Sequence, residues 1–243
     1  FAIVSVNMAI AQGTTVTYLP PEFEGDERSN YYIDLLKLSM EKTVESHGNY
    51  ELVPAEGSFT QREGLIAMRN GKLDVAHTMT SDAREMVFRP VRVPLNKGLI
   101  GYRLLLVNEG QSNMLIGSAN EEGAKNIAYI QGSDWPDTEI LKKNGYQVKT
   151  HKDYRKLFDM LQANKGDAFP RSIIEIWDEV DQHDNITVEE NIVLKYPASM
   201  YFFVRKGNKA LAERIKRGLD KAIADGSFDE MFQSYHEGFL ERA

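Results

Sequence analysis

Three groups of polar side chains follow predicted strands, and their types and spacing suit the binding of a carboxylate. The first group follows the strand that begins at Asp74 and consists of Thr78, Thr80, Ser81 and Arg84. The second is Gly132, Ser133 and Asp134 after a strand at 126–130, and the third is Arg171 after a strand at 167–169. A carboxylate needs free backbone N–H groups at a helix start and a guanidinium fork. Ser81 and Ser133 are equally suited to helix capping, but three groups at equivalent strand ends favour a binding cleft.

The composition and motifs argue against several other kinds of site. The 243 residues include no cysteine, which excludes disulfides, cysteine–zinc sites and thiol nucleophiles. The five histidines lack HxH, HExxH or HxxxH spacing, and no GxGxxG, P-loop or GxSxG motif is present. With 29 basic and 36 acidic residues, the net charge is −7, so no basic excess is available to bind a nucleic acid. We therefore expect no metal, no cofactor and no nucleic-acid partner.

The elements that must position these side chains alternate between strands and helices in two series. The β-branched run at 14–18 predicts a strand, and apolar residues at helical spacing in 32–44 predict a helix. Extended segments near 104–108 and 193–198 join the two series. This alternation predicts an α/β fold of two lobes, each a mostly parallel sheet flanked by helices. Ligands in such folds bind in the cleft, at the carboxyl ends of strands and beside helix N-termini.

The first eleven residues have the character of a processing signal. Phe1 to Ala11 contains no charged residue and ends in a small-x-small pattern, so cleavage is expected between Ala11 and Gln12. We interpret the segment as the remnant of a secretory signal peptide, which predicts a periplasmic protein. The alternative is an apolar first strand. No run in the chain approaches the roughly 20 apolar residues of a membrane span.

Several segments resemble one known family. Gly71 to Glu85 (GKLDVAHTMTSDARE) is similar to the "GKxD… T-x-x-R" signature of the family 3 extracellular solute-binding proteins, the polar-amino-acid receptors of ABC importers. Further similar segments occur in the family's order at Tyr31–Leu35 (YYIDL), Ile130–Ser133 (IQGS), Gly166–Ala168 (GDA) and 204–226. The resemblance covers residues 14–241. It implies the type II periplasmic-binding-protein fold, with one discontinuous lobe at 12–106 plus 197–243 and a second at 107–196.

The resemblance also implies roles for individual residues. Arg84 would clamp a ligand carboxylate, and Ser133 would donate a hydrogen bond from the second lobe. The donors from the first lobe would be Thr78, Thr80 and Ser81. Tyr18 and Trp135 are interpreted as aromatic walls of the cleft from their positions. Arg62, on an early helix, is either a further site residue or a surface residue.

At one position the chain departs from the family pattern. In such amino-acid receptors an acidic residue about five positions after the "vDA" aspartate receives the ligand's ammonium group. Ser172 occupies this position, beside Arg171, and neither can pair with a cation. A buried ammonium without a partner is costly, so we predict a ligand with at least two acidic or carbonyl functions, such as a dicarboxylate or an amine-blocked amino acid. The alternative is that Arg171 points to solvent and Glu175 or Asp134 receives an ammonium.

These observations lead to one main functional hypothesis and two alternatives. The main hypothesis is a monomeric periplasmic receptor, without enzymatic activity, that captures a small carboxylate-bearing solute for the membrane permease of an ABC importer. The first alternative is a ligand-sensing protein that signals to a membrane sensor. The second is an enzyme similar to the periplasmic dehydratases of this family, with Glu175 as its acid or base.

Overall fold

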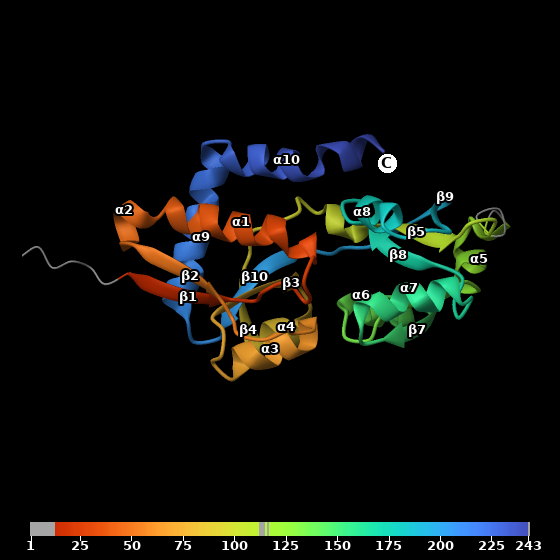
Figure 1. Ribbon diagram of the computed structural model, residues 1–243, viewed down its shortest axis with the longest axis horizontal. Coiled ribbons are helices and arrows are strands. Elements are labelled where there is room, and N and C mark those ends of the chain that lie inside the picture. Colours follow the sequence, from red (N-terminus) through yellow and green to blue (C-terminus); the bar gives the residue numbers. More distant parts are fainter. Residues whose placement is uncertain (1–12, 112–114, 116, 243) are drawn as a thin grey trace, which may run out of the picture.

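The structure is a computed structural model that describes residues 13–111, 115 and 117–242. Two α/β bodies lie next to each other along the long axis of the molecule, and the chain passes between them twice (Figure 1). The predicted α/β class with two lobes is thereby confirmed. The predicted signal segment, Phe1–Ala11, lies outside the described residues. Among the helices of the described residues, none combines the length and the apolar character needed to cross a membrane.

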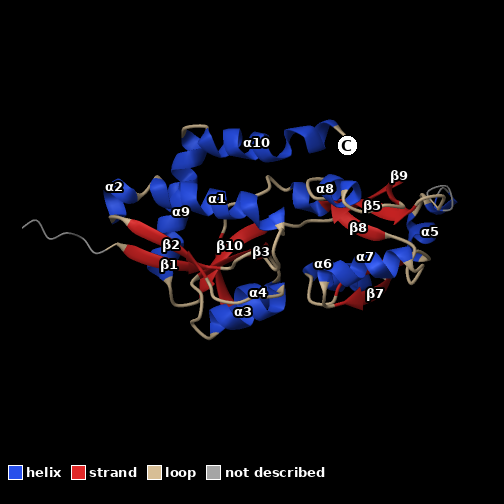
Figure 2. Cartoon of the chain, in the orientation of Figure 1, coloured by secondary structure: helices blue, strands red, loops and turns tan. Residues whose placement is uncertain are grey.

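Lobe 1 is built on a five-stranded sheet in the order β2-β1-β3-β10-β4. Its strands are β1 (Thr14–Tyr18), β2 (Tyr50–Pro54), β3 (Val75–Met79), β4 (Phe88–Val91) and β10 (Met200–Arg205). Its helices are η1 (Glu27–Ser29), α1 (Asn30–Glu41), α2 (Val44–His47), α3 (Gln61–Arg69), α4 (Asp82–Val87), α9 (Lys209–Ala224) and α10 (Ser227–Glu241). Helices cover both faces of the sheet, with α1 and α9 on one side and α3 and α4 on the other (Figure 2).

Local sequence explains where the helices beside the cleft begin. Thr60 and Glu63 form a capping box at the start of α3, with each side chain bound to the other residue's backbone N–H. The Ser81 hydroxyl accepts a hydrogen bond from the Arg84 backbone N–H, 3.3 Å away, and so caps α4. Both helices therefore start at the edge of the lobe 1 sheet that faces lobe 2.

Lobe 2 contains a three-stranded antiparallel sheet and a parallel strand pair. Its strands are β5 (Tyr102–Asn108), β6 (Ala128–Gly132), β7 (Gln147–His151), β8 (Phe169–Ser172) and β9 (Ile186–Lys195). Its helices are α5 (Glu121–Lys125), α6 (Pro136–Lys143), α7 (Tyr154–Gln162) and α8 (Ile176–Asp181). A bridge between Tyr129 and Ala168 connects β6 to the segment before β8. Phe158 of α7 packs with Trp177 of α8 and Phe169 of β8 in the lobe's core.

The strand pairing is mixed rather than mostly parallel. Three strand pairs of the described residues are parallel (β1–β2, β1–β3 and β6–β7) and four are antiparallel (β3–β10, β4–β10, β5–β8 and β5–β9). The exceptions have a topological cause, because the antiparallel pairs all involve β5 or β10. The first of these strands enters lobe 2 from lobe 1 and the second returns to lobe 1, so both run against their neighbours.

The two crossings between the lobes touch each other next to the cleft. The short helix η2 (Leu99–Gly101) begins after Lys97 and Gly98, which have positive φ angles of 52° and 84°. A Cβ atom on Gly101 would lie 2.2 Å from the Tyr196 carbonyl oxygen of the other crossing, so glycine is required there. The sequence predicted that the first lobe boundary lies between residues 106 and 107. Because β5 lies entirely in the sheet of lobe 2, we propose that this boundary lies at Gly101 instead. For the second lobe boundary we propose the predicted position, between residues 196 and 197.

Candidate functional site

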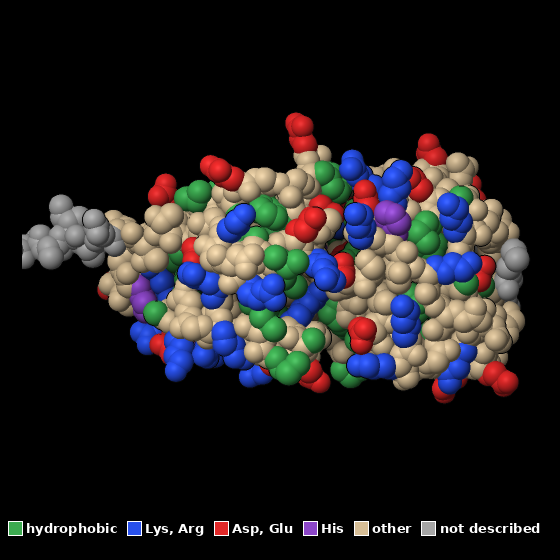
Figure 3. Space-filling model, turned by 90° about the horizontal axis from the view of Figure 1, so that it is seen from below, with side chains coloured by type: hydrophobic (Ala, Val, Ile, Leu, Met, Phe, Trp, Pro, Cys, Tyr) green, Lys and Arg blue, Asp and Glu red, His purple; other side chains and the backbone are tan. Residues whose placement is uncertain are grey.

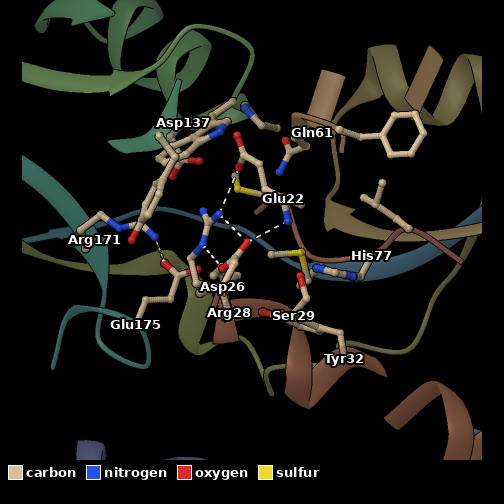
Figure 4. A pocket seen from close by; sticks show the side chains of 18 of the residues that line it. Glu22, Asp26, Arg28, Ser29, Tyr32, Gln61, His77, Asp137, Arg171 and Glu175 are labelled. Carbon is tan, nitrogen blue, oxygen red and sulfur yellow. Dashed lines mark hydrogen bonds and ion pairs between the residues drawn. The ribbon is translucent and has the colours of Figure 1, made fainter. Parts of the chain in front are cut away.

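A cavity of about 130 Å³ lies between the lobes. Its walls come from the carboxyl ends of strands in both lobes: Leu19 follows β1, Met79 ends β3, Trp135 follows β6 and Arg171 lies in β8. Charged side chains from the two lobes converge on this cavity (Figure 4). The charged lining residues are Glu22, Asp26, Arg28, Arg103, Asp137, Lys152, Arg171 and Glu175. The cavity can therefore offer a solute both cationic and anionic partners.

On the lobe 1 side, Arg28 is held in place by two carboxylates. Its Nε lies 2.7 Å from Asp26 Oδ1, and one Nη lies 3.0 Å from Glu22 Oε2. Burial opposes ionisation of Asp26, but the Arg28 guanidinium outweighs burial and lowers the Asp26 pKa. The guanidinium also lies over the ring of Tyr154 in lobe 2, with 3.6 Å from Cζ to the ring centroid. Arg28 therefore connects the two lobes without being free to bind an anion.

On the lobe 2 side, two buried arginines share one carboxylate. Arg103 lies 2.6 Å from Asp137 and 3.3 Å from Glu175, and Arg171 lies 2.6 Å from Glu179 and 3.2 Å from Glu175. Burial raises the pKa of Glu175, but Arg171 and Arg103 outweigh this effect and the net shift is downward. Glu175 is therefore held ionised, and each of the two arginines already has carboxylate partners.

Arg84 differs from these arginines because it has no carboxylate within salt-bridge distance among the described residues. Its guanidinium donates to Thr78 Oγ1 at 2.5 Å, the Met79 carbonyl at 2.7 Å, Gln61 Oε1 at 2.5 Å and, across the cleft, the Asp134 carbonyl at 3.0 Å. Burial lowers its pKa to about 10. A buried guanidinium held by neutral acceptors alone is a favourable place for an incoming carboxylate.

The structure brings some of the predicted site residues together and separates others. Trp135 and Arg171 line the cavity. Thr78 and Arg84 contact each other just behind it, with Gln61 between Arg84 and the cavity. Arg62 forms an ion pair with Asp134 across the lobes, 2.9 Å apart, although its side chain is 66% exposed.

Four further predicted residues do not line the cavity. Ser81 caps α4, and the Thr80 hydroxyl donates to Glu85 at 2.7 Å. Tyr18 packs against the core of lobe 1. Strand β6 ends at Gly132, two residues later than the predicted 126–130, so the Ser133 N–H donates to the His151 carbonyl on β7. Arg171, expected just after a strand, lies within β8, and its side chain points inward rather than to solvent.

No pattern in the sequence indicated that three charged residues would line the cavity. Arg28 and Asp26 lie in a polar loop, and Asp137 follows Pro136 at the start of α6. Arg103 did carry a signal, because it is the single charge in the apolar segment 99–107. A charged residue in a buried strand is rarely found without an ionic partner. His77 also lines the cavity, where burial lowers its pKa to about 4 and its ring stacks on Tyr32 at 4.2 Å.

Comparison with known proteins adds sequence relatives and structural neighbours. The chain is 24% identical to the ABC transporter glutamine-binding protein of Bacillus subtilis (strain 168) over 180 residues, which are 72% of this chain and 62% of that relative. The chain thus spans less than two thirds of that relative's length. It is also 24% identical over 242 residues to the "Probable histidine-binding protein" of Campylobacter jejuni, covering 95% of this chain and 86% of the relative.

The structural likeness is broader than the sequence likeness. A Salmonella typhimurium periplasmic binding protein with high arginine specificity superposes with a TM-score of 0.70 at 14% identity, covering 92% of this chain and 100% of that one. No family model matches the chain. The motif resemblance seen in the sequence is nevertheless confirmed by the named relatives and the shared fold. The chain is similar to amino-acid-binding proteins of ABC transporters, in line with the resemblance to the family 3 extracellular solute-binding proteins, and it has the type II periplasmic-binding-protein fold.

Proposed function

We propose that the chain is a periplasmic receptor that binds an amino-acid-like solute between its lobes and delivers it, as a monomer, to the membrane permease of an ABC importer. The single observation that carries this proposal is Arg84, a buried guanidinium next to the interlobe cavity that has neutral acceptors only. Basic side chains also gather where the lobes meet on the face seen from below, although the whole chain has a net charge of −7 (Figure 3). Such a local excess of positive charge attracts anionic groups to the site.

We infer how a solute would be held from the atoms that remain available. A ligand carboxylate would replace the oxygens of Gln61 and Asp134 on Arg84, since Gln61 lies between this guanidinium and the cavity. An ammonium group would face Glu175, whose Oε2 accepts hydrogen bonds from Arg103 and Ser172 while its Oε1 has none from the described residues. This arrangement suits one carboxylate and one cationic or donor group.

The ligand class favoured by these contacts differs from the one expected from the sequence. A dicarboxylate or an amine-blocked amino acid was expected because neither Ser172 nor Arg171 can pair with an ammonium group, which left Arg171 as a partner for a second anionic or carbonyl group. Arg171 is instead paired with Glu179 and Glu175, so a second anionic group would lack a free partner there. A cavity of about 150 Å³ in another protein holds benzene, which indicates a compact solute for the 130 Å³ here.

We propose binding without chemistry. A dehydratase-like enzyme would need an acid or base, and Glu175 is the candidate next to the cavity. Its pKa is lowered by two guanidinium groups, which leaves it ionised and a weak base. The same contacts that would hold a ligand ammonium therefore make Glu175 a poor proton donor.

Calorimetry with the purified chain tests this function. We expect one or more small amino acids to bind with a 1:1 stoichiometry and to raise the melting temperature, because ligand at a hundredfold excess over Kd stabilises the folded state by about 2.7 kcal/mol. Dicarboxylates and N-acetyl amino acids serve as the competing classes, and NMR of the recovered ligand checks that it is unchanged. The absence of any response across these classes would contradict the proposal, and conversion of the ligand would favour an enzyme.

A further inference from the structure

A second cavity, of about 110 Å³, lies beneath α10 on the other side of Arg28. Its walls come from the loop at 23–28 and the start of α1 in lobe 1, from the start of α7 and from α8 with the turns that flank it in lobe 2, and from the C-terminal half of α10. Figure 1 shows α10 running above α1 and ending close to α8. The cavity is therefore closed only when both lobes and α10 are in the positions seen here.

One wall of this cavity is a buried histidine whose ring has no hydrogen-bond partner. His236 is 7% exposed, and neither Nδ1 nor Nε2 has a partner among the described residues. Burial lowers its pKa to about 4, so the ring is neutral at pH 7 and offers one acceptor and one donor. Leaving a buried polar atom unpaired is energetically unfavourable. A partner that enters the cavity would recover this cost.

The charge of the second cavity is predominantly negative. Among its described lining residues the one cation is Arg28, which Asp26 and Glu22 already neutralise. Glu27 of lobe 1 and Asp178 of lobe 2 form no ion pair with any described residue and lie near enough to repel each other, although Arg242 partly offsets the charge of Asp178. Burial, together with Asp181, Glu179 and Glu27, raises the pKa of Asp178. A positive charge placed between the lobes at this point would remove the repulsion.

Aromatic rings form much of the remaining wall. The contributing side chains are Phe23, Tyr31, Tyr32, Tyr154, Tyr235 and Phe239. The hydroxyl groups of Tyr31, Tyr154 and Tyr235 bind Leu95, Glu179 and Asp34, so these residues offer their rings rather than their oxygens. Aromatic rings with nearby carboxylates are the surroundings that organic cations favour. A metal ion is disfavoured, because the described residues contain no group of three potential metal ligands.

We propose that this second cavity binds a small primary ammonium compound. The ammonium N–H groups would donate to the His236 ring, its charge would lie between Glu27 and Asp178, and its hydrocarbon part would pack on the aromatic rings. The site goes beyond the proposed solute-binding function and does not depend on it. Because the lining belongs to both lobes, the bound cation would favour the closed arrangement and, by linkage, tighten binding in the first cavity.

Titration with n-butylammonium chloride tests the site. Calorimetry is performed on the full chain, with sodium chloride at the same ionic strength as the reference. We expect saturable binding to the wild type and at least tenfold weaker binding to His236→Phe, which keeps a ring but removes both nitrogens. Asp178→Asn, an isosteric change at an exposed position, should weaken binding several-fold. The matched controls are His47→Phe and Asp184→Asn, both at exposed positions outside the cavity.

Each outcome decides the proposal. Binding that is weakened in both cavity variants and unchanged in both controls supports it, and if His236→Phe does not fold, Asp178→Asn decides alone. Heat equal to that of sodium chloride would show that the ammonium compound does not bind and would overturn the site. Equal affinity in Asp178→Asn and the wild type would also overturn it. Amino-acid binding by the same wild-type sample is measured separately, so failure here is distinguishable from failure of the proposed receptor function.

Discussion

At the scale of single residues, the guanidinium groups near the first cavity divide into two kinds. Arg28, Arg103 and Arg171 each contact carboxylates of their own lobe, and their charges are balanced before any solute arrives. Arg84 has neutral acceptors alone and touches lobe 2 through the Asp134 carbonyl. The first three arginines therefore shape the cavity with charges that are already balanced. The charge of Arg84 is not balanced by any carboxylate of the described residues and is available to a ligand.

Replacement of Arg84 should have a large effect on solute binding. Loss of one partner of a buried charge pair costs about 2–5 kcal/mol, so Arg84→Ala should weaken binding by at least thirtyfold. Arg62→Ala serves as the control, because exposed ion pairs contribute about 0–1 kcal/mol, and the expected loss is below about fivefold. Calorimetry on both variants, with folding checked by circular dichroism, makes the comparison. Equal losses in the two variants would remove Arg84 from the site.

Sequence reasoning at this scale found residues whose function is local and missed those whose function depends on distant partners. Arg84 was predicted because hydroxyl residues and a helix start surround it in the sequence. Ser81 shows the limit of that argument, since the same hydroxyl caps α4 and does not reach the cavity. The pairing of Arg103 with Asp137 joins positions far apart in the chain, and no spacing pattern encodes such a contact.

At the scale of elements, the alternation of strands and helices and the bounds of β1 were predicted correctly, but the directions of β5 and β10 and the bounds of β6 were not. The antiparallel β5 and β10 follow from the chain's passage between lobes, which hydrophobic periodicity does not report. The two-residue shift of β6 has a similar origin: its last residues pair with β7 through tertiary contacts. Ser133 directly follows the strand, donates its N–H to the His151 carbonyl of β7 and does not line the cavity.

Helix α10 should weakly stabilise the contact between the two lobes. It packs on α1 and α9 of lobe 1, and near its C-terminal end Arg242 pairs with both carboxylate oxygens of Asp181 in lobe 2, at 2.7 and 3.0 Å. The same guanidinium lies over Trp177, 4.5 Å from the ring centroid. Because the pair is exposed, its contribution should be about 0–1 kcal/mol.

Arg242→Ala should therefore speed solute release by up to about fivefold, because most effects of contact mutations appear in the dissociation rate. Arg217→Ala, on the exposed face of α9, removes an arginine from lobe 1 without touching lobe 2 and should leave the rate unchanged. Stopped-flow displacement measures both. Identical release rates in the two variants would show that α10 does not help to hold the lobes together.

At the scale of the whole molecule, the contacts between lobes are of a kind that can separate without unfolding either lobe. They include the Arg84–Asp134 hydrogen bond, the Arg62–Asp134 ion pair and the Arg28–Tyr154 stacking, whereas each lobe has its own apolar clusters. The chain crosses between lobes at segments that touch at Gly101. Small φ and ψ changes at such paired crossings can produce hinge closure around a ligand.

The absence of cysteine allows a direct test of closure. In the double variant Arg62→Cys, Asp134→Cys, the two new thiols replace an ion pair that now spans the lobes at 2.9 Å. If the lobes separate without solute, the best ligand from the amino-acid screen should increase the yield of a short bismaleimide cross-link several-fold, because ligand shifts the population toward the closed form. The variant Glu56→Cys, Arg62→Cys places both thiols in lobe 1, and its yield should not respond to ligand. Equal yields with and without ligand in the interlobe variant would mean that the lobes form one rigid unit, and solute would then have to enter the cavity without hinge motion.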